Sequence, residues 1–173
     1  MVLFFHLKEK YGLQVFPVND KYFMQLAIDE AMAALSEGEV PVGALVVVGG
    51  EVVSRAHNRR ELDNDPTAHA EVLALRRAAE KLGRWRLPDA TVYITKEPCV
   101  MCAGAMMHAR VARVVYGAHD PKYGAAWSIY NILGDDRLNH TAEVTSGVMA
   151  DECLALLREF FEERRISIKG KTG

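Results

Sequence analysis

The spacing of apolar residues along the chain changes between a helical and an extended period. Over residues 20–35 they recur at intervals of three and four, and Gly38 follows, which predicts an amphipathic helix. Residues 43–48 instead form an apolar run of strand length. The Gly-Gly pair at residues 49–50 then predicts a hairpin turn into a return strand over residues 51–56.

Helices and strands alternate through the rest of the chain. The same criteria predict helices over residues 68–82, 98–109 and 151–165, and strands over residues 91–95, 113–116 and 143–146. Gly83 and Pro98 stand where helices typically end and begin. A chain in which strands alternate with helices is expected to form an α/β fold, with helices layered on a central sheet.

The predicted helix at residues 98–109 carries no Asp, Glu, Lys or Arg after Cys99. A helix that is apolar on all sides must be covered on all sides, and a sheet covers only one of them. A second copy of the chain could cover the rest, which gives dimerisation a motive. Full burial within one chain is the alternative, and the sequence leaves both open.

Composition limits the class of protein. The chain has 173 residues, enough for one domain with its own core, and half of them are apolar. The net charge is −2, so there is no overall attraction to phosphate backbones. This argues against a general nucleic-acid binder and leaves room for a local basic patch. Three cysteines are a poor disulfide framework.

The sequence predicts neither an N-terminal export signal nor a membrane span. The N-terminus has no basic region followed by an apolar stretch of signal-peptide length, and the longest clean aliphatic run, residues 44–48, is too short to span a bilayer. We therefore expect a cytoplasmic protein with no membrane partner. We also expect a leader at residues 1–19, one domain at residues 20–168 and a short tail at residues 169–173.

Two short motifs carry candidate chemistry. Cys99 and Cys102 stand in a C-x-x-C arrangement at a predicted helix start, where free N–H groups and the helix dipole stabilise thiolates. His69 begins another predicted helix and can add an imidazole. Three protein ligands leave a tetrahedral zinc ion one open position, which is typical of catalytic rather than structural sites.

Glu71 completes the pattern as a candidate general acid and base. A carboxylate beside a zinc-bound water can take its proton and deliver it to a leaving amine. The resulting H-x-E … P-C-x-x-C pattern is the known signature of zinc nucleobase deaminases. Two alternatives remain, a redox pair and a structural zinc site, but neither uses both His69 and Glu71. Cys153 stands alone and is expected to be a core residue.

Several segments resemble the bacterial tRNA-specific adenosine deaminase family, and together they cover residues from about 20 to 168. They are residues 39–44, 65–71, 97–106, 117–120, 124–126 and 138–140, and the ending from Ala150 to Arg165. The resemblance implies a homodimer that converts adenosine to inosine at the wobble position of a tRNA anticodon. It also implies the cytidine-deaminase-like fold, a three-layer α/β/α sandwich with a mixed five-stranded sheet.

The resemblance also assigns roles to individual residues. His69, Cys99 and Cys102 would hold Zn²⁺, and Glu71 would move the proton. The residues implied to contact the substrate are Asn58, the backbone of Ala70, Asp120, Asn139, His140 and Phe161. For Asn58 the alternative is a turn residue. Of the adjacent residues Phe160 and Phe161, one is expected to pack in the core, because neighbouring helical positions point about 100° apart.

Basic residues near the C-terminus are candidates for RNA contact. They are Arg158, Arg164, Arg165, Lys169 and Lys171. A solvated helix face is the alternative. Lys96 and His119 depart from the residues usual in the family, so a free-base or nucleoside deaminase acting on guanine, cytosine or cytidine is the alternative function. A non-catalytic zinc-stabilised module is a third, which the presence of Glu71 argues against.

Overall fold

All of the predicted helices and strands are present in the computed structural model, which describes residues 19–169. In chain order they are α2 (Asp20–Ser36), β1 (Gly43–Val48), β2 (Glu51–His57), α3 (Ala70–Leu82), β3 (Ala90–Lys96), α4 (Val100–Ala109), β4 (Arg113–Ala118), β5 (Glu143–Ser146) and α5 (Ala150–Lys169). The predicted leader and tail fall almost entirely outside the described residues. The division into leader, domain and tail therefore stays a prediction.

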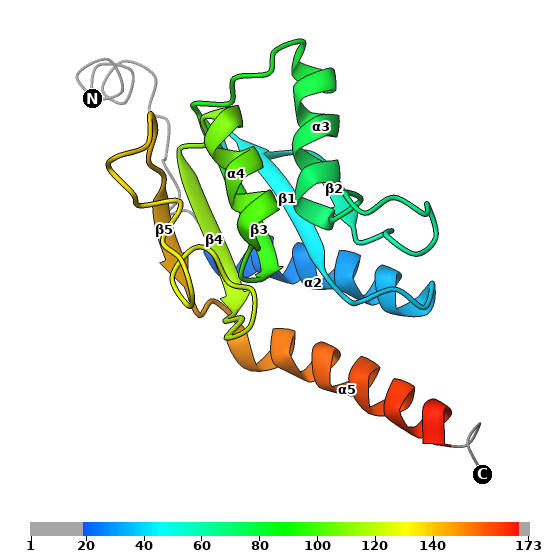
Figure 1. The fold of residues 1–173 in the computed structure, drawn as a ribbon. Coiled ribbons are helices and arrows are strands. Elements are labelled where there is room, and N and C mark those ends of the chain that lie inside the picture. Colours follow the sequence, from blue (N-terminus) through cyan, green and yellow to red (C-terminus); the bar gives the residue numbers. More distant parts are fainter. Residues whose placement is uncertain (1–18, 170–173) are drawn as a thin grey trace.

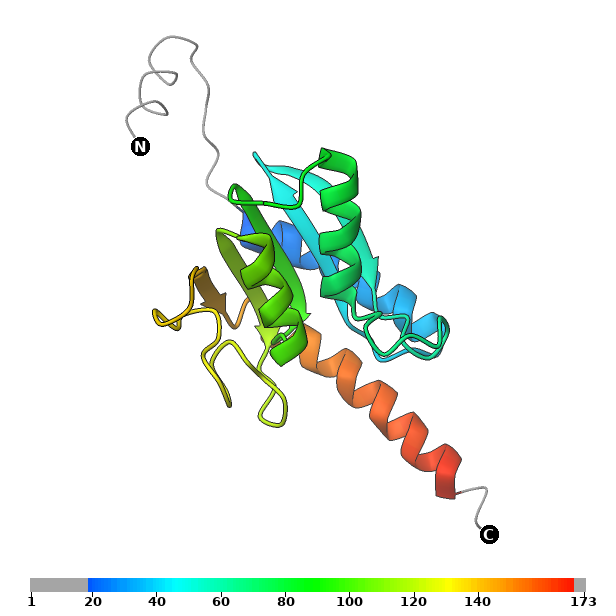
Figure 2. The same ribbon diagram turned by 45° about the horizontal axis from the view of Figure 1, so that its top comes forward.

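The five strands form one mixed sheet in the order β2-β1-β3-β4-β5. Strand β1 runs antiparallel to β2 and β3, whereas β3, β4 and β5 are parallel to one another. Helices α3 and α4 cover one face, and α2 and α5 lie on the other (Figures 1 and 2). The predicted α/β/α sandwich with a mixed five-stranded sheet is confirmed.

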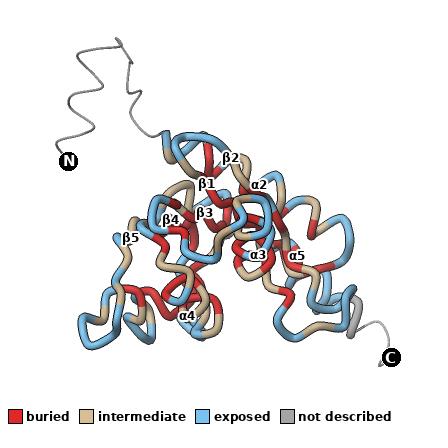
Figure 3. Tube along the Cα trace, turned by 90° about the horizontal axis from the view of Figure 1, so that it is seen from above, coloured by how far each residue is buried: buried red, intermediate tan, exposed pale blue. Residues whose placement is uncertain are grey.

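Alternation along the central strands divides the core into two layers. In β1, Ala44 and Val46 face the cluster that includes α3 and α4, whereas Leu45 and Val47 face the cluster that includes α2 and α5. Both faces of this strand are buried, so the strand is a continuous apolar run (Figure 3). Cys153 is buried in the second cluster, as predicted.

Two helices begin later than the sequence pattern predicts, and this matters for the site. His69 and Cys99 are the N-cap residues of α3 and α4, with extended backbones at ψ 147° and 175°. Cys99 pairs with Gly124 in an isolated antiparallel bridge, which keeps it out of the helix. The predicted starts at residues 68 and 98 are therefore wrong by two residues. For Cys99 the cause is its bridge to Gly124, and for His69 it is a local turn in which its N–H donates to the carbonyl oxygen of Thr67.

Helix α4 is covered on one face only. Cys102, Ala103, Met106 and Met107 are buried against the sheet and α3, while Val100 on the opposite side is 49% exposed. The alternative of full burial within one chain is thus wrong. Among the described helices, none is both long and apolar enough to cross a membrane.

Candidate active site

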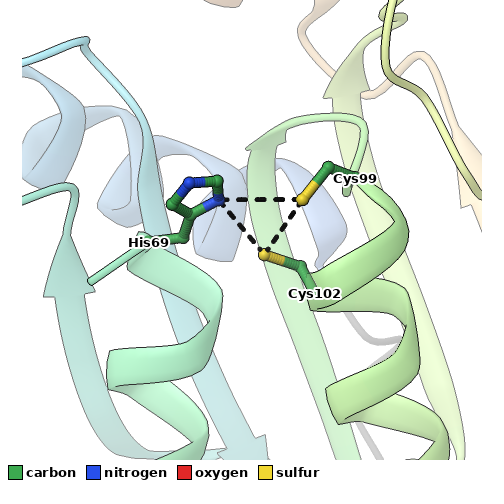
Figure 4. Close-up of side chains that lie close together, drawn as sticks. All are labelled: His69, Cys99 and Cys102. Atoms are coloured by element: carbon green, nitrogen blue, oxygen red, sulfur yellow. Dashed lines mark hydrogen bonds between the residues drawn. The ribbon is translucent and has the colours of Figure 1, made fainter. Parts of the chain in front are cut away.

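The N-terminal ends of α3 and α4 bring three metal-binding side chains together (Figure 4). His69 Nδ1 lies 3.7 Å from the sulfur of Cys99 and 3.4 Å from that of Cys102, and the two sulfurs are 3.6 Å apart. The ring and both thiols converge from two helices that are far apart in sequence. The predicted ligand set is thus assembled by the fold.

The spacing of these atoms fits zinc. Two sulfurs bound to one tetrahedral zinc ion at about 2.3 Å are about 3.8 Å apart, close to the distance between these sulfurs. The close contact of the Cys99 thiol with the Cys102 thiol is the main reason why the pKa of Cys99 is lowered to about 3, and the contact with the His69 ring adds to it. A metal ligand must be a thiolate, so this environment prepares Cys99 for binding.

Glu71 lies in the first turn of α3 and lines the cavity beside the ligands. Its side chain is buried, and burial raises the pKa of Glu71 above the ordinary value of a glutamate. A carboxylate with a raised pKa exchanges protons more readily near neutral pH. The predicted general acid and base therefore has a suitable environment.

The ligands and Glu71 open into a cavity of about 430 Å³, which is in the usual range for small-molecule sites. Two predicted substrate-contacting residues, Asn58 and Phe161, are in its wall. The complete lining is Val40, Val42, Asn58, Arg60, His69, Glu71, Lys96, Glu97, Cys99, Tyr123 and Phe161. Phe161 is half exposed, while Phe160 is buried, which confirms the prediction that one of these neighbours packs in the core.

Other predicted contact residues lie outside the cavity wall. Ala70 is fully buried at the start of α3, between two residues that line the cavity. Asp120 is buried too, and its carboxylate accepts hydrogen bonds from the Lys96 side chain and from the backbone N–H of Lys122. The Asp120 carboxylate therefore holds the Lys96 side chain and the backbone at Lys122 in place.

Asn139 and His140 lie at the opposite end of α4 from the ligands. Asn139 accepts hydrogen bonds from Arg110, the residue that ends α4, and His140 Nε2 lies 2.8 Å from the carbonyl oxygen of Val111. Ten helical residues span about 15 Å. The fold thus does not bring these two residues to the cavity of the same chain.

Of the basic residues near the C-terminus, Arg158, Arg164 and Arg165 have described side chains, and all three are exposed on α5. Arg164 lies over the ring of Phe160, and Arg165 donates to the carbonyl oxygen of Phe161. Lys171 lies outside the described residues.

Sequence reasoning missed the role of Glu97, which organises the loop over residues 120–128. Its buried carboxylate accepts hydrogen bonds from the backbone N–H groups of Asp120, Trp127 and Ser128, and from the Ser128 hydroxyl. A Cβ atom at Gly124 would lie 2.4 Å from the Glu97 Cδ atom, so the loop can wrap the carboxylate only with glycine there. The wrapped loop places Tyr123 at the cavity.

The loop also explains the electrostatics of Glu97. Burial alone would raise the pKa of Glu97, but the hydrogen bonds from Ser128, Asp120 and Trp127 outweigh it and lower the pKa to about 2. The carboxylate is therefore charged at neutral pH, with donors on both oxygens. The only hint in the sequence is that Glu97 directly precedes Pro98 and Cys99, which gives no information about a loop 23 to 31 residues further on.

Comparison with known proteins establishes the family. Residues 18–165 match the MafB19-like deaminases. Since this is most of the chain, the protein belongs to that family.

Individual relatives are more specific. The chain is 50% identical over 147 residues to the tRNA-specific adenosine deaminase of Bacillus subtilis (strain 168), covering 85% of this chain and 91% of the relative. A solved structure from work on A-to-I editing by tRNA:A34 deaminases is 45% identical, with a TM-score of 0.76, over 79% of this chain and 99% of the other. The family resemblance inferred from the motif segments is confirmed, and the protein is an enzyme of the deaminase class.

A more distant relative has a different activity. The guanine deaminase of Nitrosomonas europaea superimposes with a TM-score of 0.73 at 25% identity, over 90% of this chain and 91% of the other. The same fold therefore occurs in a free-base deaminase.

Replacing Glu97 with glutamine tests the wrapped loop. A glutamine offers one acceptor oxygen where four donors converge, so we expect Glu97→Gln to lower the free energy of unfolding by about 3 kcal/mol at pH 7. Because folding lowers the pKa of Glu97, its stabilisation is complete above about pH 4.5 and is lost as the pH falls towards 2. Urea unfolding at several pH values should show the difference between the two proteins shrinking over that range. An equal difference at pH 3 and pH 7 would contradict this assignment.

Proposed function

We propose that this protein is a zinc-dependent hydrolytic deaminase that converts adenosine to inosine at the wobble position of a tRNA anticodon. The observation that carries the proposal is the His69–Cys99–Cys102 group beside buried Glu71, at a cavity in a chain that is 50% identical to a tRNA-specific adenosine deaminase. A base must leave its stack to reach such a cavity, and an anticodon loop is already partly unstacked. We expect the enzyme to act in the cytoplasm.

The reaction replaces the amino group at C6 of adenine with an oxygen from water. A zinc ion held by His69, Cys99 and Cys102 would supply the activated water. Glu71 would accept one proton of that water as the C6–O bond forms and pass it to the ring nitrogen next to C6. It would then take the remaining proton from the new hydroxyl group and deliver it to the amino nitrogen, so that the C6–O bond becomes a carbonyl, the C6–N bond breaks and ammonia leaves. The backbone of Ala70 and the side chain of Asn58 hold the nucleoside.

Features at the cavity mouth suit RNA. Phe161 and Tyr123 are exposed aromatic residues at the cavity, and unpaired bases stack on such rings. Arg60 lies in the same wall with half of its side chain exposed, whereas Lys96 there is paired with Asp120. Arg60 and the exposed arginines of α5 together offer a local attraction for phosphates on a chain of net charge −2. We propose that Asp120, Asn139 and His140 contact the RNA away from the reacting base.

A free-base deaminase is the second candidate, because the guanine deaminase of similar fold shows that this architecture can serve that reaction. The two candidates share the ligand set and Glu71. They differ in whether the bases and phosphates around the target contribute to binding.

Parallel assays with RNA and with free substrates distinguish these two candidates. Purified protein is incubated with an anticodon stem-loop carrying a wobble adenosine and, separately, with free adenosine, guanine and cytidine. We expect inosine only in the RNA, and a loss of about 100-fold or more in turnover for Glu71→Ala with zinc retained, because the proton carrier is gone. Turnover of a free base with none of the RNA would contradict the proposed substrate.

Metal analysis tests the ligand set. We expect about one zinc per chain, and loss of that zinc in Cys99→Ser, because a serine hydroxyl is a poor zinc ligand. Cys153→Ser is the matched control, since Cys153 is buried in the other core layer and should leave the zinc content unchanged. Full zinc occupancy in Cys99→Ser would refute the assignment.

We further propose that the enzyme is a homodimer that covers the open face of α4. Val100 is half exposed there, and Met101, Gly104 and Ala105 are only partly covered. Light scattering at micromolar concentration should give about twice the chain mass of 19.2 kDa, and Ala105→Glu should shift the protein towards the monomer. A wild-type mass near 19.2 kDa would count against the dimer.

A further inference from the structure

A buried glutamate lies directly behind the substrate-binding face of Asn58. Glu39 precedes β1, does not line the cavity and is 1% exposed. Its Oε2 atom accepts a hydrogen bond of 2.8 Å from Asn58 Nδ2, and its Oε1 atom accepts one of 2.8 Å from the backbone N–H of Leu62. One carboxylate thus holds both the side chain of Asn58 and the loop that follows it.

This contact fixes which way the Asn58 amide points. An ionised carboxylate can only accept hydrogen bonds, so the amide must turn its NH₂ group towards Glu39. The backbone of Asn58 is held separately, because its N–H donates to the carbonyl oxygen of Val42 over 3.0 Å. The main chain is therefore fixed and only the rotation of the amide remains to be set.

The amide oxygen of Asn58 is consequently the atom left for the substrate. Among residues 19–169 no donor contacts Asn58 Oδ1, and no buried side-chain nitrogen or oxygen there lacks a partner. Because this oxygen has no protein partner and is not sealed in the core, it reaches the surface of the protein, and the surface that Asn58 lines is the cavity. The site thus offers an acceptor at this point.

We propose that Glu39 is a positioning residue that locks Asn58 with its oxygen towards the substrate, so that the site selects a nucleoside presenting a hydrogen-bond donor there. The inference rests on the proposed function, because it takes Asn58 to contact the nucleoside. Glu39 itself does not touch the substrate, and it acts through the orientation of one amide.

Glutamine at position 39 should reverse that orientation. The N–H of Leu62 still requires an acceptor, so the glutamine oxygen takes that side and its NH₂ group faces Asn58. Asn58 must then turn its own oxygen towards position 39 and its NH₂ group into the cavity. In Glu39→Gln, the cavity therefore receives a hydrogen-bond donor from Asn58 in place of an acceptor. The size and packing of the residues at positions 39 and 58 are unchanged.

Aspartate at position 58 should restore the pattern in that background. In Glu39→Gln/Asn58→Asp, one oxygen of the aspartate accepts from the glutamine NH₂ group and the other is an acceptor in the cavity. Asn58→Asp alone sets two carboxylates face to face, which is unfavourable. Each single variant should therefore be impaired and the double variant should be better than either.

The experiment measures kcat/KM for the wild type, both single variants and the double variant, using the substrate that the wild type turns over. We expect each single variant to lose about 10- to 100-fold, and the double variant to recover at least about tenfold over either single variant. Glu37→Gln is the matched control, because Glu37 lies two residues away but pairs with Arg59 and His57 instead, and it should change kcat/KM less than about twofold. Zinc content and thermal unfolding of every variant report folding.

The outcomes separate this inference from the proposed function. A wild type inactive on the anticodon RNA contradicts the proposed function, and the rescue pattern on its actual substrate still decides the role of Glu39. The inference is overturned if kcat/KM of Glu39→Gln is within about twofold of the wild type. It is also overturned if the loss of kcat/KM in the double variant equals the product of the two single losses. If Glu39 served only to hold the loop at Leu62, the losses of the two single variants would multiply in the double variant. A change at Asn58 cannot repair a defect in that loop. If Glu39→Gln fails to fold, kcat/KM of the double variant is compared with that of Asn58→Asp alone. A recovery of about tenfold supports the inference, and no recovery overturns it.

Discussion

The meeting of two helix N-termini at one edge of the sheet is the constraint on which the site depends. His69 and Cys99 are both cap residues with extended backbones, so their side chains extend past the helix ends towards a common point. Cys102, one turn into α4, completes the group. Because both helices direct the positive ends of their dipoles to this point, they stabilise thiolates and a developing negative charge. The cavity, the buried acid and the loops around them are arranged about this junction.

Three buried glutamates surround the junction, and their partners explain their different roles. Glu97 receives four hydrogen bonds and Glu39 receives two, so both are anchored as acceptors that hold loops and side chains in place. Glu71 is set apart by a pKa that burial raises. The site therefore combines a carboxylate suited to exchanging protons with two that keep the cavity wall rigid, which is the preorganisation that catalysis requires.

Periodicity and spacing are sufficient for the layers of the fold and for the two motifs that contain His69 and the cysteines, because each of these is a local signal. That the two motifs meet is a contact over 30 residues, and it follows from the fold. The apolar run of β1 spans only six residues, and Cys99 and Cys102 are three positions apart in the sequence. The contacts of Glu39 with Asn58 and of Lys96 with Asp120 span 19 and 24 residues, and they depend on loop paths that no period encodes. The same limit applies to Asn139, whose distance from the cavity follows from the direction of α4. What covers the open face of α4 cannot be predicted from the sequence, because an apolar helix can be covered by its own chain or by a second copy.

X-ray absorption by the zinc-loaded protein tests the central claim most directly, since it counts the atoms around the metal. Two sulfur atoms at about 2.3 Å, one nitrogen and one oxygen at about 2.0 Å are predicted, which corresponds to Cys99, Cys102, His69 and a water in the open position. That oxygen should persist in Glu71→Gln, because Glu71 is not a ligand. A shell of three or four sulfur atoms, or one completed by a second histidine, would show a closed structural site and contradict the account.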